Sequence, residues 1–273
     1  MKYLFIELVI IMSISITNAQ SLYQVFDQDG REVTIERIIN EAESRPLIFF
    51  GELHNQEFAH TAEMDLLKGL NEKFPGRVVL GMEMFEADVQ PIVDEYFSGK
   101  INQKSFETES RIWTNYKTDY KPMVEFAKHN GLKFVATNVP RRYANTVYHR
   151  GLNMLDSLSS YAKQFFPELP LQIDTNIQIY QEMLTMVPDH SSVNMVYSQG
   201  LKDATMAHFI LNNKYENQVF LHINGSYHSK NKQGILSFLN DYPITKTITI
   251  NAVLLEENKK LDFSSADFTI IKL

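Results

Sequence analysis

The sequence predicts an α/β fold: a mostly parallel β-sheet flanked by helices, with a smaller all-helical subdomain inserted before the last βα unit. Strand-like apolar runs alternate with amphipathic helical segments over the first 150 residues, which is typical of βαβ units. Residues 151–215, in contrast, contain no strand-like run. Four of the strand-like runs end in polar groups: IFFGELH (48–54), RVVLGMEMFE (77–86), KFVATNVPRR (133–142) and FLHINGSYH (220–228).

Turn and capping signals predict the elements of the first hundred residues. An Asp-Gly pair lies between two alternating segments and predicts a β-hairpin. Asn55 and Asp88 each precede an amphipathic segment, where a side-chain oxygen can accept bonds from the free amides of a helix start. We therefore expect strands at 23–26, 32–34, 46–50 and 77–80, and helices near 38–39, from 55 to 70 and from 88 to 97.

The rest of the chain completes the sheet and adds a helical lid. Pro122 is tolerated in the first turn of a helix that Gly131 ends, and a strand then runs to Asn138. Strands at 245–251 and 268–271 follow the last GxxH segment. We expect one α/β domain made of residues 20–150 and 216–273, with residues 151–215 forming a lid over the strand ends.

Residues 1–19 have the pattern of a cleavable signal peptide. Lys2 supplies the positive end, an apolar stretch runs from 4 to 16, and Thr-Asn-Ala at 17–19 forms a small-residue cleavage site. The chain has no cysteine, so disulfides and a lipid-modified cysteine are excluded. We expect an exported protein, periplasmic or secreted, that is not a lipoprotein.

Composition indicates a folded protein without a nucleic-acid surface. Hydrophobic residues make up 44% of the chain and aromatic residues 12%, which suits a globular core. The formal net charge of −7 and the absence of a basic stripe argue against binding to phosphate backbones.

The polar strand ends predict a shared rim. The carboxyl ends of parallel neighbouring strands lie together, and ligands bind at that edge of open α/β sheets. Imidazole and carboxylate groups are ligands for zinc, iron, manganese or cobalt, so His54, Glu83 and His228 could bind a metal ion. In the alternative interpretation, these histidines cap helices and the glutamates bond to backbone amides. The other six histidines lack a comparable position, and we expect them to be packed or solvated: His60, His129, His149, His190, His208 and His222.

Two further positions carry charge where it needs a partner. Arg141 and Arg142 begin a helix, where cations are slightly disfavoured, which indicates either an anionic partner or a solvated surface pair. Asp203 lies on the inner face of its helix, where an unpaired carboxylate would be costly. We expect Asp203, with Asn138, to support the rim, and Asp203 to bond to one of the arginines or to backbone amides.

Several ordered motifs together resemble a known family. GELHNQ, GMEMFE, WTNY, KFVATNVPRRYA, QGLKDATMA and NGSYH are similar to segments of the ChaN-like haem-binding uptake proteins, in the superfamily that also contains the Tiki, TraB and erythromycin-esterase-like proteins. The resemblance implies an exported α/β domain that binds haem beneath a helical subdomain, and dimers that can stack two haems. Many ChaN-like proteins are lipoproteins, and this cysteine-free chain departs from that pattern.

The resemblance implies a haem-binding protein of iron or haem uptake, with haem in a cleft at the strand ends. His54 and His228 are the first candidates for the axial iron ligand, followed by Tyr227 and Tyr143. Arg141 and Arg142 could bind the haem propionates. A homodimer and an outer-membrane haem or iron receptor are the expected partners.

The alternative function is a metal-dependent hydrolase, a Tiki-like protease or esterase that uses a divalent transition metal. In that case His54, Glu83 and His228 bind the ion, and Glu52 or Glu86 activates water.

Overall fold

The computed structural model describes residues 22–186, 193–255 and 261–273. The predicted signal peptide and His190 lie outside these ranges. Within them, no helix has the length and apolar character needed to cross a membrane.

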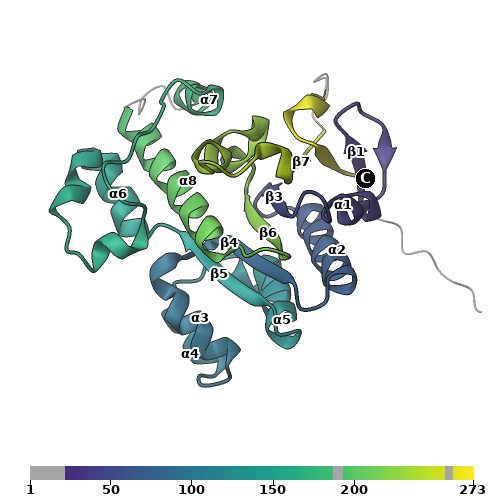
Figure 1. The fold of residues 1–273 in the computed structure, drawn as a ribbon, viewed down its shortest axis with the longest axis horizontal. Coiled ribbons are helices and arrows are strands. Elements are labelled where there is room, and N and C mark those ends of the chain that lie inside the picture. Colours follow the sequence, from purple (N-terminus) through teal and green to yellow (C-terminus); the bar gives the residue numbers. More distant parts are fainter. Residues whose placement is uncertain (1–21, 187–192, 256–260) are drawn as a thin grey trace, which may run out of the picture.

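Eight strands form one sheet in the order β2-β1-β8-β7-β3-β6-β4-β5 (Figure 1). All neighbours from β8 to β5 are parallel, whereas β1 is antiparallel to both β2 and β8. The predicted α/β class and mostly parallel sheet are therefore confirmed. The strands are β1 (Tyr23–Asp27), β2 (Glu32–Val33), β3 (Leu47–Glu52), β4 (Val78–Glu86), β5 (Lys133–Asn138), β6 (Val219–Gly225), β7 (Thr247–Val253) and β8 (Phe268–Lys272).

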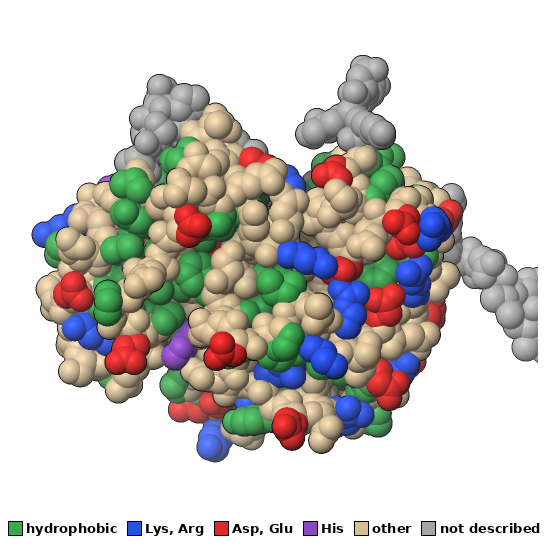
Figure 2. Space-filling view, turned by 45° about the horizontal axis from the view of Figure 1, so that its top comes forward, with side chains coloured by type: hydrophobic (Ala, Val, Ile, Leu, Met, Phe, Trp, Pro, Cys, Tyr) green, Lys and Arg blue, Asp and Glu red, His purple; other side chains and the backbone are tan. Residues whose placement is uncertain are grey.

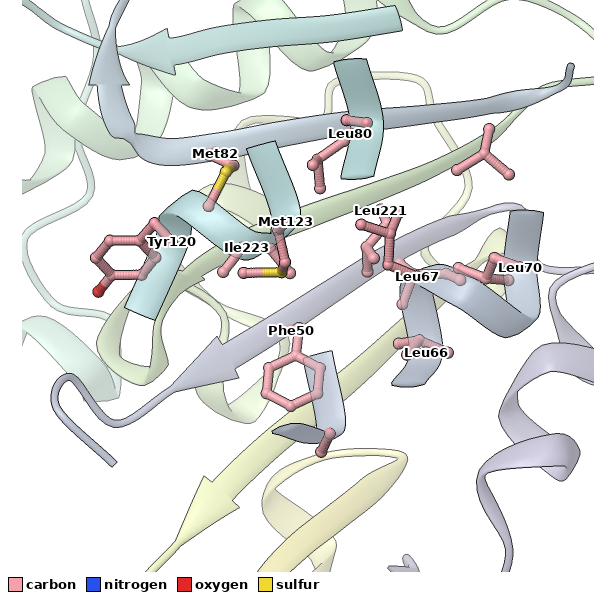
Figure 3. Packing of buried hydrophobic residues seen from close by; sticks show 14 of the residues in the cluster. Phe50, Leu66, Leu67, Leu70, Leu80, Met82, Tyr120, Met123, Leu221 and Ile223 are labelled. Atoms are coloured by element: carbon pink, nitrogen blue, oxygen red, sulfur yellow. The ribbon is translucent and has the colours of Figure 1, made fainter. Parts of the chain in front are cut away.

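Helices cover both faces of the sheet. The α-helices are α1 (Ile35–Glu41), α2 (Glu57–Lys73), α3 (Gln90–Phe97), α4 (Gln103–Glu109), α5 (Lys121–His129), α6 (Arg141–Arg150), α7 (Gln178–Met186) and α8 (Val193–Asn213). Alternate residues of each central strand point to opposite faces. Phe50 of β3 packs with α2 and α5 on one face (Figure 3), and Phe49 packs with α8 on the other.

The predicted lid is not wholly separate from the sheet. Residues 152–166 pack against α6 and the first half of α8. The second half of α8, including Met206 and Ile210, instead packs directly on β3, β4, β5 and β6. The segment expected to form the lid, residues 151–215, thus contains a helix, α8, whose second half belongs to the α/β core.

Figure 2 shows acidic and basic side chains interspersed over one face of the molecule.

Strand β4 is longer than predicted, because Gly81 does not end it. β4 continues to Glu86, with an irregularity in its pairing with β5 between Met82 and Glu86. A Cβ atom on Gly81 would lie only 2.5 Å from the ring of Phe220 on the neighbouring strand. The glycine therefore makes room for a side chain of β6 within the sheet.

Both predicted capping assignments are wrong. Asn55 has a φ of 62°, and α2 begins after Gln56, whose side chain makes no capping bond. Asp88 is part of a short 3₁₀ turn before α3, and its carboxylate pairs with Arg111 and Arg142. Charged donors are stronger partners than helix amides, which explains the loss of this cap.

A side chain covers part of the outer edge of β5. The amide of Gln90, at the start of α3, donates to the carbonyl of Phe134 at 3.0 Å and accepts from the amide of Ala136 at 2.7 Å. The side chain of Gln90 therefore makes the two hydrogen bonds that a neighbouring strand would make at this point of β5.

Candidate functional site

Three neighbouring strands bring the predicted rim residues together. β6 lies between β3 and β4, and Glu52 at the end of β3 is in register with Gly225 at the end of β6. The Gly225 amide donates to Glu83 Oε2 at 2.8 Å. A Cβ atom on Gly225 would meet His54 Nε2 at 3.2 Å and Glu83 Oε2 at 3.6 Å, so glycine permits this close approach.

His228 is buried between two carboxylates. Its Nε2 lies 3.1 Å from Glu83 Oε1, and its Nδ1 bonds to Asp203 Oδ1. Tyr180 donates to the other oxygen of Asp203 at 2.7 Å. The side chain of His228 is 7% exposed, and each ring nitrogen faces a carboxylate oxygen. The side-chain amide of Gln199 also lies 3.1 and 3.2 Å from the two nitrogens. Two flanking carboxylates favour the doubly protonated imidazolium.

The pKa directions agree with that assignment. Burial disfavours the charged ring, but Glu83 and Asp203 outweigh it and raise the pKa of His228 to about 10. Burial opposes ionisation of Glu83 too, yet His228 and the Gly225 amide hold the pKa of this carboxyl well below its ordinary value. Both shifts favour the ionised forms of Glu83 and His228, which therefore stabilise one another as an ion pair.

We expect this pair to make stability depend on pH. A histidine whose pKa is about 6.5 when unfolded and about 10 when folded contributes stability that is complete below pH 6.5. That contribution is lost as pH rises through 10. Chemical denaturation between pH 7 and pH 10 should show a falling free energy of unfolding, with a smaller slope in His228→Gln. The variant should still lose some stability over this range, because the pKa of His60 is also raised to about 10. An unchanged slope in the variant would contradict the charged state of His228.

His54 is held differently and has a free side. Its Nδ1 bonds to the buried carboxylate of Glu52, which raises the pKa of His54. Its side chain is 41% exposed, and the ring meets Trp113 edge-on at 5.2 Å between centroids. Within the described residues Nε2 makes no hydrogen bond, and it faces the backbone of Gly225. A histidine oriented by a carboxylate through one nitrogen presents the other to a metal or haem iron.

Glu52 also belongs to a buried cluster on α2 that sequence reasoning missed. His60 Nδ1 lies 3.0 Å from Glu63 Oε2 and 3.3 Å from Glu52 Oε2. Tyr120 donates to Glu52 Oε1 at 2.6 Å. Because His60 does not follow a strand, its sequence position predicts only a packed or solvated histidine. The available signal was Glu63, a carboxylate on the inner, apolar face of its helix.

The predicted metal set is not assembled in the described residues. The donor atoms that lie within 4.8 Å of one another there are those of Glu52, His60 and Glu63. His54, Glu83 and His228 form no such group, and both nitrogens of His228 already face carboxylates.

The structure corrects the predicted partners of Asp203. Asp203 is fully buried, as expected, but its partners are His228 and Tyr180, not Arg141, Arg142 or backbone amides. α8 brings Asp203 to His228, which follows the end of β6. Asn138 does support the rim, because its side-chain amide donates to the Glu83 carbonyl at 3.0 Å.

Ion pairs at the end of β4 involve two of the remaining charged candidates, Arg142 and Glu86. Arg142 pairs with Asp88 at 2.6 Å, and its guanidinium lies over the ring of the neighbouring Tyr143. Glu86 pairs with Arg111 at 2.8 Å. Arg141 is exposed. Glu86 is therefore engaged by an arginine and is a poor candidate for activating water beside His54.

The two candidate tyrosines, Tyr143 and Tyr227, each contact a neighbouring basic side chain. Tyr143 is buried, packs on Phe166, and its hydroxyl accepts from Arg142 at 3.2 Å. Tyr227 is half-buried, with the Lys230 ammonium 5.8 Å from its ring centre. His222 is packed, as predicted, between Thr137 and Asn224, and burial lowers its pKa to about 4.

Comparisons with known proteins agree with this arrangement of strands. A family profile described as haem-binding uptake, Tiki superfamily, ChaN matches residues 38–239. The chain is similar to ChaN of Campylobacter jejuni, a structure described by its cofacial heme binding, with 18% identity, a TM-score of 0.71, and coverage of 92% of this chain and 97% of that one. A Bacillus cereus protein gives a TM-score of 0.54 at 9% identity, with 88% and 92% covered. A search of curated proteins gave no match.

Proposed function

Because the chain belongs to the ChaN family of haem-binding uptake proteins in the Tiki superfamily, we propose that it binds haem at the carboxyl ends of β3, β4 and β6. The observation that carries this site is the half-exposed ring of His54, whose Nδ1 is held by buried Glu52. A hydrogen bond from Nδ1 to a carboxylate makes the opposite nitrogen a stronger ligand.

His54 is the axial ligand in this proposal, and His228 is not. An axial histidine must offer one unprotonated ring nitrogen to iron. Both nitrogens of His228 face carboxylates, and its ring is buried. When bound, haem would supply the iron, while His54 coordinates it and Trp113 provides an aromatic wall beside the ring.

A second chain extends the proposal. The Campylobacter structure is described by cofacial heme binding, and the partly exposed ring of His54 would hold haem at the surface of this chain. We infer that two chains stack their haems face to face. Export through residues 1–19 and transfer to or from an outer-membrane receptor belong to the same proposal.

Haemin titration tests the binding. Adding haemin to the chelator-treated chain should give a saturable Soret shift that differs from the spectrum of free haemin. Sedimentation of the loaded protein should show a dimer. A Soret band that grows linearly, as it does with a non-binding control protein, would contradict haem binding. A saturable band on a monomer would retain haem binding and overturn the cofacial dimer.

The hydrolase alternative has less support from the geometry. Although its proposed ligands His54, Glu83 and His228 lie near one another, their donor atoms form no group within 4.8 Å in the described residues. Both ring nitrogens of His228 face carboxylates, and Glu86 is paired with Arg111.

A further inference from the structure

The buried cluster of Glu52 at the end of β3 with His60 and Glu63 on α2 carries an inference about a ligand other than haem. One oxygen of Glu52, one of Glu63 and one ring nitrogen of His60 lie within 4.8 Å of one another. The side chains of both glutamates are 0% exposed, and that of His60 is 9% exposed. These are two carboxylates and an imidazole in a site closed to bulk water.

Two oxygens of the cluster have no hydrogen-bond partner. His60 Nδ1 lies 3.0 Å from Glu63 Oε2, and this contact serves only one of the four carboxylate oxygens. Glu52 Oε2, 3.3 Å from the same nitrogen, and Glu63 Oε1 are both buried without a hydrogen-bond partner. No lysine or arginine of the described ranges forms an ion pair with either glutamate. Buried carboxylate oxygens without a partner destabilise the folded state unless a cation or a hydrogen-bond donor meets them.

The second nitrogen of His60 has an orienting carboxylate. Nε2 makes no hydrogen bond but lies 3.2 Å from Asp119 Oδ2, close enough for an ion pair. Asp119 in turn accepts from the side-chain amide of Asn115 at 2.8 Å. A carboxylate behind the far nitrogen of a histidine is the usual support for a metal-bound imidazole.

We propose that Glu52, Glu63 and Nδ1 of His60 bind a divalent transition-metal cation. At the usual metal–ligand lengths, neighbouring ligands of a tetrahedral ion lie about 3.3 Å apart. The observed 3.0 and 3.3 Å separations need little adjustment to reach that value. Mixed nitrogen and oxygen donors without thiolate suit Zn²⁺, Mn²⁺ or Fe²⁺, whereas Mg²⁺ and Ca²⁺ prefer oxygen alone. The ion would give the two unpartnered carboxylate oxygens, Glu52 Oε2 and Glu63 Oε1, a positive partner inside the cluster.

Cobalt provides the test because Co²⁺ at a low-coordinate protein site absorbs visible light more strongly than hydrated Co²⁺. Titrating CoCl₂ into the chelator-treated full chain should give saturable bands at one equivalent, and ZnCl₂ should displace them. Glu63→Gln should abolish the bands. Asp119→Asn should weaken binding about 10- to 100-fold. His208→Gln, a change on the opposite face of the sheet, should bind as the parent does.

Circular dichroism of each variant shows whether it folds. If Glu63→Gln does not fold, the weakening by Asp119→Asn decides the question. The proposal is overturned if the parent gives no saturable bands, if the folded Glu63→Gln binds cobalt like the parent, or if Asp119→Asn has parental affinity. It is equally overturned if Glu83→Gln abolishes cobalt binding while Glu63→Gln retains it, because the metal would then lie at the other rim set.

Discussion

Replacing Asp203 with alanine is expected to lower the free energy of unfolding by about 3–5 kcal/mol, the usual cost of breaking a buried ion pair. Asp203 is 0% exposed and bonds to both His228 and Tyr180. Its loss leaves Glu83 as the single carboxylate beside the His228 ring and leaves the Tyr180 hydroxyl without its acceptor. The cost arises from these two stranded donors more than from the missing carboxylate.

Denaturant unfolding of the parent and the variant measures this effect. Asp241→Ala is the matched control, because Asp241 is exposed in a turn and such changes usually stay within about 0.5 kcal/mol. Tyr180→Phe removes only one of the two contacts and should cost about 1–3 kcal/mol. If Asp203→Ala unfolds at the same denaturant concentration as Asp241→Ala, the His228–Asp203 pair does not stabilise the fold.

Replacing His54 with alanine is expected to change the spectrum of the haem-loaded protein, because the axial ligand sets the spin state and Soret position of the iron. Glu52→Gln should produce a smaller shift in the same direction, since the amide holds Nδ1 of His54 less strongly than the carboxylate does. Absorbance spectra of the loaded variants, recorded at equal saturation, provide the measurement.

The arginine pair provides a contrasting control. Arg141→Ala together with Arg142→Ala should weaken haem binding and leave the spectrum nearly unchanged, because guanidinium–propionate bonds affect affinity without touching the iron. Arg142 is already paired with Asp88, so Arg141→Ala should account for most of the loss. A parental Soret band in His54→Ala would remove His54 as ligand, and Tyr227 and Tyr143 would be tested next.

Sequence patterns predicted the sheet because its strands are short apolar runs bounded by glycine and proline. They also predicted that Glu52, His54, Glu83 and His228 lie close together, because parallel strands end at one edge. The partners of Asp203 could not be predicted in this way. Its burial follows from periodicity along α8, but which group it meets depends on how that helix crosses β6, which no local pattern encodes.

The His60 cluster could not be predicted from strand ends, because His60 lies on the first turns of a helix that packs beside β3. Glu63, three residues further along, is buried among the apolar residues of that helix. Like Asp203, Glu63 is a carboxylate on the inner face of a helix, and such a group needs a partner.

The pairing of Gln90 with β5 affects how copies of this protein can assemble. A parallel sheet that ends in an open strand offers its backbone groups to any extended segment of another chain, a common route to aggregation. At Phe134 and Ala136 those groups are already bonded within the same molecule. An incoming strand would first have to displace an intramolecular amide. At the opposite edge, β2 is only two residues long and offers little template. Two copies of this chain are therefore expected to associate through side-chain surfaces and not by joining their sheets edge to edge.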